Sequence, residues 1–169
     1  MITISRHETD YRERCMKDCY TIRMAGPEDG VCLAEFNRAM ARETENRELP
    51  EAVIKAGVSH LLEHPEYGFY IVAEVGGRVA GCLLITYEWS DWRDGLFWWI
   101  QSVYVHPDFR RQGIYRRLHA FVREQAQQRG GVCGIRLYVE KDNQAAQNAY
   151  TTLGMLKTPY LIFEEIFNR

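Results

Sequence analysis

The amino-acid sequence predicts a mixed α/β (α+β) fold, in which a mostly antiparallel central sheet of about six strands is flanked by helices. Segments with the two-residue period of strands alternate with segments of helical spacing in the order β, α, α, β, β, β, α, β, α, β. Three consecutive strands are joined at Gly76-Gly77 and at Asp94-Gly95, and such pairs are typical of tight hairpin turns in an antiparallel meander. The 169 residues, 46% of them hydrophobic, suit a single packed core.

The elements follow in chain order after a polar arm that we expect over residues 1–19, and the folded domain is expected over residues 20–169. Residues 20–25 (YTIRMA) predict the first strand, and Pro27 followed by acidic residues predicts a helix start. The first two helices, separated by a polar loop (ETENRELPE), are predicted over residues 31–43 and 52–64. The meander strands are predicted over residues 69–75, 78–89 and 96–105. The later elements are helix 114–129, strand 133–140, helix 143–153 and strand 160–167.

The composition excludes several classes of protein. The 21 Lys and Arg side chains against 23 Asp and Glu give a net charge of -2, which argues against a nucleic-acid partner, since such surfaces need a broad basic field. No run of about 18 uncharged apolar residues is present, so we expect no membrane partner. The first residues lack the apolar core of a signal peptide, which favours a cytoplasmic protein. The five cysteines lack CxxC spacing, which favours reduced thiols and no metal site.

Residues 106–122 (HPDFRRQGIYRRLHAFV) place four arginines around a lone glycine, Gly113. A strand is predicted to end at Val105, His106-Pro107 interrupts its ladder, and Gly113 stands at the start of the next helix. The first amides of a helix have no carbonyl partner and attract anions, and a glycine lets an anion approach the backbone closely. Neither the P-loop pattern nor GxGxxG occurs here. The segment predicts a site for a pyrophosphate-bearing ligand, with a helix start carrying solvated arginines as the alternative.

Residues 103–118 (VYVHPDFRRQGIYRRL) resemble the acetyl-CoA-binding motif of the GNAT superfamily of N-acetyltransferases. Arg110, Gly113 and Tyr115 fall on that pattern, although a small residue usually stands in the place of Tyr115. Residues 137–155 (LYVEKDNQAAQNAYTTLGM) resemble the later strand and helix of the same family, with Asn143 after the strand and Tyr150 seven residues later. Two turns of helix place those two residues on one face.

The resemblance implies a GNAT-like fold, acetyl-CoA as the acetyl donor and no metal. It implies main-chain hydrogen bonds from the last strand of the meander to the pantetheine arm, and an amide near a bulge in that strand that polarises the thioester carbonyl. Tyr150 takes the role of general acid. The cofactor-binding residues that it implies are Val103, Tyr104, Val105, Arg110, Arg111, Gln112, Gly113, Ile114, Tyr115, Arg116, Asn143 and Tyr150.

Acidic and aromatic side chains are the candidates for the acceptor side. Glu88 and Asp91 are predicted between the second and third meander strands, and Glu43 and Glu45 in the loop between the first two helices, where each could attract a cationic amine or lie solvated. We take Glu88 as the candidate general base.

Trp98 and Trp99 face opposite sides of the sheet in strand geometry, so one belongs to the core. The other indicates an acceptor pocket or a contact with a second copy in a homodimer. Alternation from Trp99 puts Gln101 and Val103 on its face, with Gln101 beside the thioester.

The sequence therefore predicts an enzyme that transfers an acetyl group from acetyl-CoA to a primary amine of a small molecule or peptide. Cys82 and Cys133 lie in predicted strands, but no histidine is placed by the sequence to activate either, so we expect direct attack by the amine in a ternary complex. The alternative is a non-catalytic acyl-CoA-binding sensor or interaction module of the same fold, which Tyr115 favours.

Overall fold

The computed structural model describes residues 20–167. The predicted arm, residues 1–19, lies outside the described residues. The chain divides into two compact units between Leu137 and Tyr138. We describe each unit by itself.

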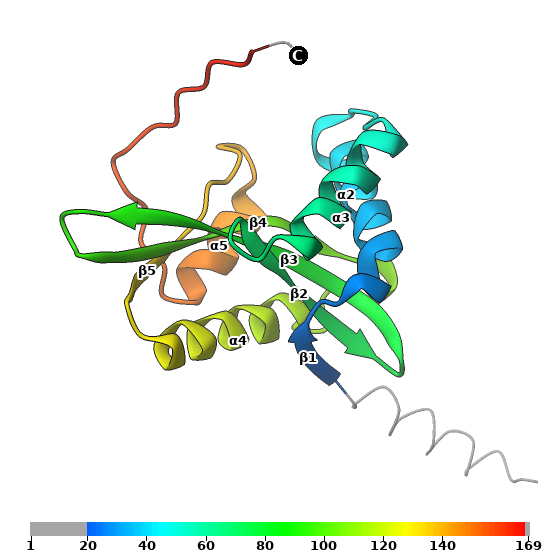
Figure 1. Cartoon of the computed structure of the whole chain (residues 1–169), viewed down its shortest axis with the longest axis horizontal. Coiled ribbons are helices and arrows are strands. Elements are labelled where there is room, and N and C mark those ends of the chain that lie inside the picture. The colour runs from blue at the N-terminus through cyan, green and yellow to red at the C-terminus, as the bar shows by residue number, and fades with distance from the viewer. Residues whose placement is uncertain (1–19, 168–169) are drawn as a thin grey trace, which may run out of the picture. The chain divides into compact units, whose positions relative to one another are not determined.

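The first unit is built on a five-stranded sheet in the order β1-β2-β3-β4-β5 (Figure 1). Its strands are β1 (Tyr20–Met24), β2 (Gly68–Val75), β3 (Arg78–Ser90), β4 (Gly95–Val105) and β5 (Val132–Arg136). The first four strands pair antiparallel with their neighbours, whereas β5 pairs with β4 in parallel. This confirms the predicted meander and the mixed, mostly antiparallel sheet.

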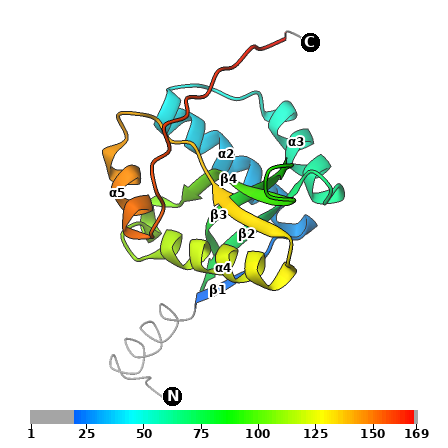
Figure 2. The same ribbon diagram turned by 90° about the vertical axis from the view of Figure 1, so that its left-hand side faces the viewer.

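Helices cover both faces of this sheet, as Figure 2 shows. One face carries α2 (Gly30–Glu45) and α3 (Glu51–Glu63), and the other carries α4 (Ile114–Arg129). Alternate residues of the strands supply the two cores, because side chains of a strand point to opposite faces. Ile71, Leu83 and Trp98 pack with the α4 side chains, whereas Tyr70, Val72 and Cys82 pack with those of α2 and α3.

The first long helix extends further than the sequence predicts. It continues through the polar segment to Glu45 and ends where Asn46 adopts a left-handed conformation, with its amide donating to the carbonyl of Ala41. Glu43 and Glu45 therefore lie in the last turn of α2, and their predicted place in a loop is wrong. The reason is that Ala, Arg and Glu are good helix formers, so a polar run need not end a helix.

A short hydrogen-bonded cluster joins β1 to the chain before α2. Arg23 donates to both carboxylate oxygens of Asp29, at 2.7 and 3.0 Å, and the amide of Gly26 donates to the same carboxylate. Asp29 is 4% exposed. Burial would raise the pKa of Asp29, but the hydrogen bonds from Arg23 and Gly26 outweigh it and lower the pKa below its ordinary value.

The second unit, residues 138–167, contains one helix, α5 (Gln144–Thr152). The side chain of Asn143 caps its start by accepting from the amide of Ala146 at 3.0 Å. The strand predicted over residues 160–167 is wrong, because these residues pair with no strand within 20–167. Apolar alternation specifies a strand only when a neighbouring strand supplies the ladder. The sheet therefore has five strands rather than about six.

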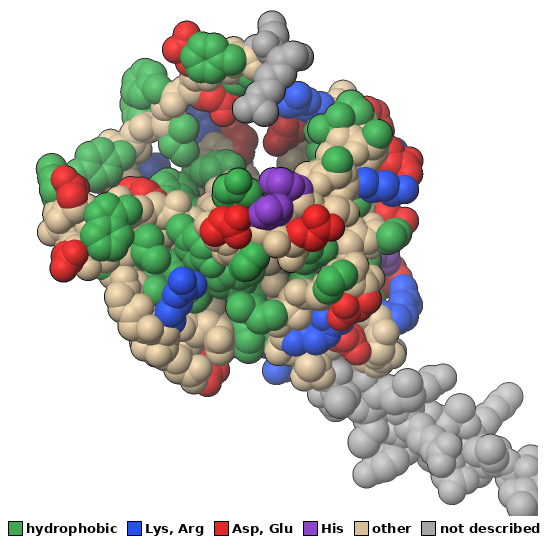
Figure 3. Space-filling model, viewed as in Figure 1, with side chains coloured by type: hydrophobic (Ala, Val, Ile, Leu, Met, Phe, Trp, Pro, Cys, Tyr) green, Lys and Arg blue, Asp and Glu red, His purple; other side chains and the backbone are tan. Residues whose placement is uncertain are grey.

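The surface carries several exposed aromatic side chains. Trp89 and Trp92, near the turn between β3 and β4, are 61% and 86% exposed. Figure 3 shows hydrophobic side chains gathered on one face, next to the histidines. Within residues 20–167, none of the helices combines the length and the apolar character that crossing a membrane requires.

Candidate functional site

Strand β4 changes its pairing halfway along its length. Its parallel ladder with β5 runs from Leu96 to Trp99, whose register partner is Arg136, and β5 then ends. Beyond Trp99, β4 stays paired with β3 but has no strand on its other side within the described chain. A bulge falls in the same stretch, where Ser102 has a φ of 48° and two residues of β4 lie opposite one residue of β3. Unpaired backbone groups therefore line this edge.

The bulge also changes which face the later residues of β4 occupy. Trp98 is 2% exposed in the α4-side core, and Trp99 lies on the other face, as predicted. Gln101 shares the face of Trp99, where its amide donates to the Thr86 hydroxyl at 2.6 Å. The predicted place of Val103 on that face is wrong, because Val103 packs with the α4-side core. The extra residue in the bulge shifts the alternation by one.

The start of α4 is an open helix end. Gly113 is the N-cap residue with a φ of 78°, and a Cβ placed there would meet nothing within 4 Å. No side chain of the described residues caps the helix start. The preceding Arg111 also has a positive φ, 63°. The first amides of α4 are thus exposed at a glycine turn, an arrangement that binds phosphate oxygens.

The predicted cofactor-binding residues around this turn have different environments. Arg111 and Arg116 are exposed and form no ion pair within residues 20–167. Gln112 donates to the carbonyl of Asp108 at 3.0 Å, which braces the turn. Ile114 is 2% exposed in the core, and the half-buried ring of Tyr115 lies 6.1 Å from that of His119, one helical turn later.

The side chain of Arg110 is fixed by two hydrogen bonds near the carboxyl end of β4. Its Nε donates to the carbonyl of Val105 at 2.9 Å, and its Nη2 donates to Glu43. The guanidinium lies 5.5 Å from the centre of the Tyr104 ring, and the Tyr104 hydroxyl donates to Glu43 at 2.8 Å. Burial would raise the pKa of Glu43, but the hydrogen bonds from Tyr104 and Arg110 lower it below its ordinary value. This contact ties the end of α2 to β4 and to the turn before α4.

A second arginine–carboxylate contact lies on the same face, near the other end of β4. Arg136 donates from Nη1 to Glu88 at 2.6 Å, and its guanidinium lies 3.6 Å from the centre of the Phe97 ring. The other oxygen of Glu88 accepts from the indole nitrogen of Trp99. Glu88 lies within β3 and pairs with Phe97, so its predicted place between the two strands is wrong. Both of its oxygens accept a hydrogen bond.

Close packing holds the Phe97 ring of this contact in place. Phe97 is the register partner of Gly134 in β5, and a Cβ at Gly134 would lie 2.6 Å from the ring. Arg136, Thr86 and Gly134 are site residues that were not predicted from the sequence. The signal for two of them is present, since Gly134 and Arg136 are two residues apart in a strand and therefore share a face.

The remaining predicted acceptor residues lie further out. Glu45 is exposed at the end of α2. Asp91 is exposed in the turn between β3 and β4, where its side chain accepts from the amide of Trp92 at 2.9 Å.

Two predicted residues belong to the second unit. Asn143 acts as the N-cap of α5, and Tyr150 lies in the last turns of that helix. Burial raises the pKa of Tyr150. A phenol with a raised pKa remains protonated at neutral pH, but it is also a weaker acid, so the shift by itself does not mark a proton donor.

The cysteines in the strands differ in their surroundings. Cys82 is fully buried, and burial raises the pKa of its thiol to about 12. Such a thiol is not a nucleophile at neutral pH, because the thiolate is the reactive form. Cys133 is exposed. Within residues 20–167, no group of three or more His, Cys, Asp or Glu side chains could hold a metal ion.

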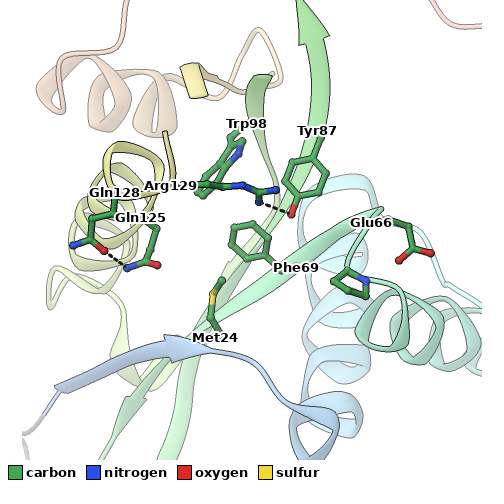
Figure 4. Close-up of a pocket in the computed structure, with 9 residues that line it drawn as sticks. Met24, Glu66, Phe69, Tyr87, Trp98, Gln125, Gln128 and Arg129 are labelled. Carbon is green, nitrogen blue, oxygen red and sulfur yellow. Dashed lines mark hydrogen bonds between the residues drawn. The ribbon is translucent and has the colours of Figure 1, made fainter. Parts of the chain in front are cut away.

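A separate cavity of about 680 Å³ lies on the α4 face of the sheet (Figure 4). Its aromatic floor includes Phe69 and Trp98, whose rings meet edge to face at 5.1 Å between centres. Arg129 at its rim donates to the Tyr87 hydroxyl at 3.4 Å. None of the residues predicted for the site lines this cavity, and it lies on the opposite face from Trp99 and Gln101.

Comparison with known proteins identifies the fold and the family. Residues 31–155 match the model of the acetyltransferase (GNAT) family. The crystal structure of a possible acetyltransferase from Clostridium difficile 630 is similar at 39% sequence identity and a TM-score of 0.83, over 90% of this chain and 100% of that one.

Two more distant structures share the fold. The ribosomal-protein-alanine N-acetyltransferase from Brucella melitensis biovar Abortus 2308 has 17% identity and a TM-score of 0.72, over 89% of this chain and 100% of that one. AAC(6')-Iy in complex with the bisubstrate analogue CoA-S-monomethyl-acetylneamine has 18% identity and a TM-score of 0.71, with the same coverage. The match over most of the chain shows that this protein belongs to the acetyltransferase (GNAT) family.

Proposed function

We propose that this protein is an N-acetyltransferase that moves an acetyl group from acetyl-CoA to a primary amine of a small molecule or peptide. The open start of α4 carries the proposal. Gly113 leaves space for an anion beside unpaired helix amides, and Arg111 and Arg116 add positive charge. These features fit the diphosphate of CoA. The occurrence of the same fold in AAC(6')-Iy with a bisubstrate analogue containing CoA supports this donor.

The free edge of β4 would hold the rest of the donor. We propose that main-chain groups of Val103, Tyr104 and Val105 bind the pantetheine arm, because this edge has no strand on its outer side within the described residues. An amide at the Ser102 bulge would donate to the thioester oxygen, since a bulge turns backbone groups out of the ladder. Around the turn, Gln112, Ile114 and Tyr115 would contribute amides. Arg110 would stabilise this turn. Asn143 is proposed as a further residue that binds acetyl-CoA.

Acetyl-CoA supplies the acetyl thioester when it is bound. In the transfer, the amine nitrogen forms a bond to the acetyl carbon, the carbon–sulfur bond breaks, the amine releases one proton and the sulfur takes one up. We propose Tyr150 as the proton donor to sulfur. Glu88 lies opposite Phe97, five residues before the Ser102 bulge, so it is proposed to accept the proton of the amine through intervening water. Each of its carboxylate oxygens keeps a lone pair after accepting one hydrogen bond.

The acceptor would enter over the face of the sheet that carries Trp99 and Gln101. Their side chains are half-buried and fixed by contacts with Glu88 and Thr86, so they could line a pocket of defined shape. Asp91 and Glu45 would act at longer range by attracting a cationic amine. The names of two structural neighbours, an aminoglycoside and a ribosomal-protein-alanine N-acetyltransferase, are consistent with amine acceptors.

Free-thiol release tests the function. Purified protein is incubated with acetyl-CoA and a panel of primary amines, and thiol release is followed for the wild type and for Tyr150→Phe. We expect turnover by the wild type and a kcat at least about 100-fold lower for Tyr150→Phe, since general acid catalysis contributes that much. Binding of acetyl-CoA without turnover on any amine would instead support a sensor. Absence of binding would refute both.

A further inference from the structure

We propose that Arg136 binds a carboxylate of the acceptor, so that the substrate carries both a primary amine and a carboxylate several atoms away from it. This inference rests on the proposed acetyltransferase function and adds the chemical class of the acceptor. It starts from the position of Arg136 at the last residue of β5, beside the point where β4 loses its parallel partner.

The guanidinium of Arg136 is fixed by its contacts, but only one of its three nitrogens donates a hydrogen bond within residues 20–167. Glu88 holds Nη1 at 2.6 Å, and the plane lies over the Phe97 ring at 3.6 Å from its centre. Within residues 20–167, Nε and Nη2 of Arg136 donate no hydrogen bond. The side chain as a whole is 33% exposed, so solvent reaches part of it. An arginine that is fixed by stacking and by one carboxylate loses little entropy when its free edge binds a second carboxylate.

The charge balance of this face favours an acceptor with both signs of charge. Glu88 and Arg136 form a neutral pair, and their neighbours Thr86 and Gln101 are uncharged. A second cation, Arg93, lies 5.2 Å from the centre of the same Phe97 ring. The attraction of Glu88 for a simple alkylammonium ion is therefore opposed by repulsion from Arg136. A carboxylate on the acceptor removes that repulsion and uses the free donors of Arg136, while the amine lies further along β4, at the bulge where the thioester is proposed to bind.

The register of β4 and β5 sets the approximate length of the acceptor. Arg136 lies opposite Trp99, and the bulge at Ser102 and Val103 begins three residues further along β4. Three to four strand residues span about 10–13 Å. The flexible arginine side chain covers part of that distance. The amine and the carboxylate must therefore be separated by a chain of several atoms, which excludes an α-amino group beside its own carboxylate as the preferred target.

A matched pair of amines tests the inference. Thiol release is measured with 6-aminohexanoate and with 6-aminohexanamide, which differ only in the carboxylate. We expect kcat/KM of the wild type to be at least about 10-fold higher for the carboxylate, which corresponds to about 1.4 kcal/mol. Glycine, with adjacent groups, should show no such preference over glycinamide.

Substitutions test whether Arg136 causes the preference for 6-aminohexanoate over 6-aminohexanamide. Arg136→Gln should abolish the preference for 6-aminohexanoate over 6-aminohexanamide, measured as the ratio of their kcat/KM values, because loss of the hydrogen bond to Glu88 affects both amines alike. Arg136→Lys, which keeps the charge but loses the planar fork, should retain part of the preference. Arg129→Gln is the control, since Arg129 lies on the opposite face of the sheet, and it should keep the full preference. Circular dichroism establishes that each variant is folded.

Direct binding separates this inference from the proposed function. Isothermal titration of 6-aminohexanoate into the wild type and Arg136→Gln needs no turnover. Weaker binding to the variant supports the carboxylate site even if no amine is acetylated, whereas equal binding and equal kcat/KM for the acid and its amide overturn it. If acetyl-CoA neither binds nor releases thiol while Arg136 still governs 6-aminohexanoate binding, the proposed function fails and the site remains.

Discussion

Two arginine–glutamate contacts lie on the same face of the sheet near opposite ends of β4. They differ in how many hydrogen-bond donors of the arginine the protein occupies. Arg110 uses two of its three side-chain nitrogens: Nη2 donates to Glu43 and Nε donates to the carbonyl of Val105. Arg136 uses one nitrogen, which donates to Glu88, and its guanidinium stacks on Phe97. The first contact fixes a turn to a helix end, whereas the second leaves donors unused by the described residues on a rigid aromatic support. A salt bridge therefore reveals a binding role only when its unused donors are considered.

The largest effect is expected for a third contact, between Arg23 and the buried Asp29, which shows what a purely structural pair does. Arg23→Gln leaves a carboxylate that is 4% exposed without its cation, and should lower the free energy of unfolding by about 3 kcal/mol at pH 7. Chemical denaturation measures this loss. Arg129→Gln, at an exposed position whose guanidinium lies over the Tyr87 and Trp98 rings, should change stability by at most about 1 kcal/mol.

The pH dependence of this effect has a defined sign. The folded pKa of Asp29 is lowered relative to about 3.9 in the unfolded chain, so its contribution is complete above that value and disappears as the pH falls through the folded pKa. The difference between the wild type and Arg23→Gln should therefore shrink between pH 5 and strongly acidic pH, within roughly the range over which paired carboxylates titrate. A constant difference over that range would contradict the assignment.

Glu88→Gln should have the next largest effect, and it sharpens the comparison because Glu43→Gln is its matched variant. Loss of the proposed base should lower kcat by about 100-fold or more near neutral pH. Glutamine can still accept from Trp99, so the fold should be kept. Steady-state kinetics of both variants checks this. Equal kcat for Glu88→Gln and the wild type would remove Glu88 from the proton transfer.

Gly134→Ala tests whether the support under Arg136 matters. The added methyl would lie 2.6 Å from the Phe97 ring, so the ring and the guanidinium stacked on it must shift. We expect the preference for 6-aminohexanoate over its amide to fall by about 3-fold to 10-fold, with little change for the amide. A crystal structure of the variant would report the ring position. If the ring is displaced but the preference is unchanged, carboxylate binding by Arg136 does not depend on its stacking on Phe97.

The smallest effect is expected at the other end of β4. Glu43→Gln weakens the grip on Arg110 and should raise the KM for acetyl-CoA about 3-fold while leaving kcat nearly unchanged, because the contact braces the turn before α4 without touching the reacting groups. Its contribution to stability should stay below about 1 kcal/mol, since Glu43 and Arg110 are each about 40% exposed. A large fall in kcat would place Glu43 in the chemistry instead.

The elements that were predicted well are those fixed by local patterns. The glycine turns defined the meander, strand alternation put Trp98 and Trp99 on opposite faces of the sheet, and Gly113 marked the start of α4. The errors depend on distant partners. The predicted face of Val103 is wrong because the pairing with β3 sets the position of the bulge at Ser102. The contact of Glu88 with Arg136, which was not predicted, joins residues 48 apart.

The ends of helices and strands were equally difficult to predict from the sequence. The extension of α2 depends on the left-handed conformation of Asn46, which composition alone does not specify. Residues 160–167 have a strand-like pattern but no neighbouring strand in the described structure.

The open start of α4 can be tested directly by isothermal titration of acetyl-CoA into the wild type, Gly113→Val and Gly130→Val. The two glycines lie just outside opposite ends of α4, with φ of 78° and 71° and no atom within 4 Å of a Cβ. Valine is strained at both, and more so at Gly130, whose ψ of 160° belongs to a region essentially confined to glycine, so Gly130→Val is the stricter control for strain. Only Gly113 adjoins the free amides. The account predicts that Gly113→Val weakens acetyl-CoA binding at least about 10-fold, or about 1.4 kcal/mol, while Gly130→Val does not. Equal affinities for all three proteins would contradict it.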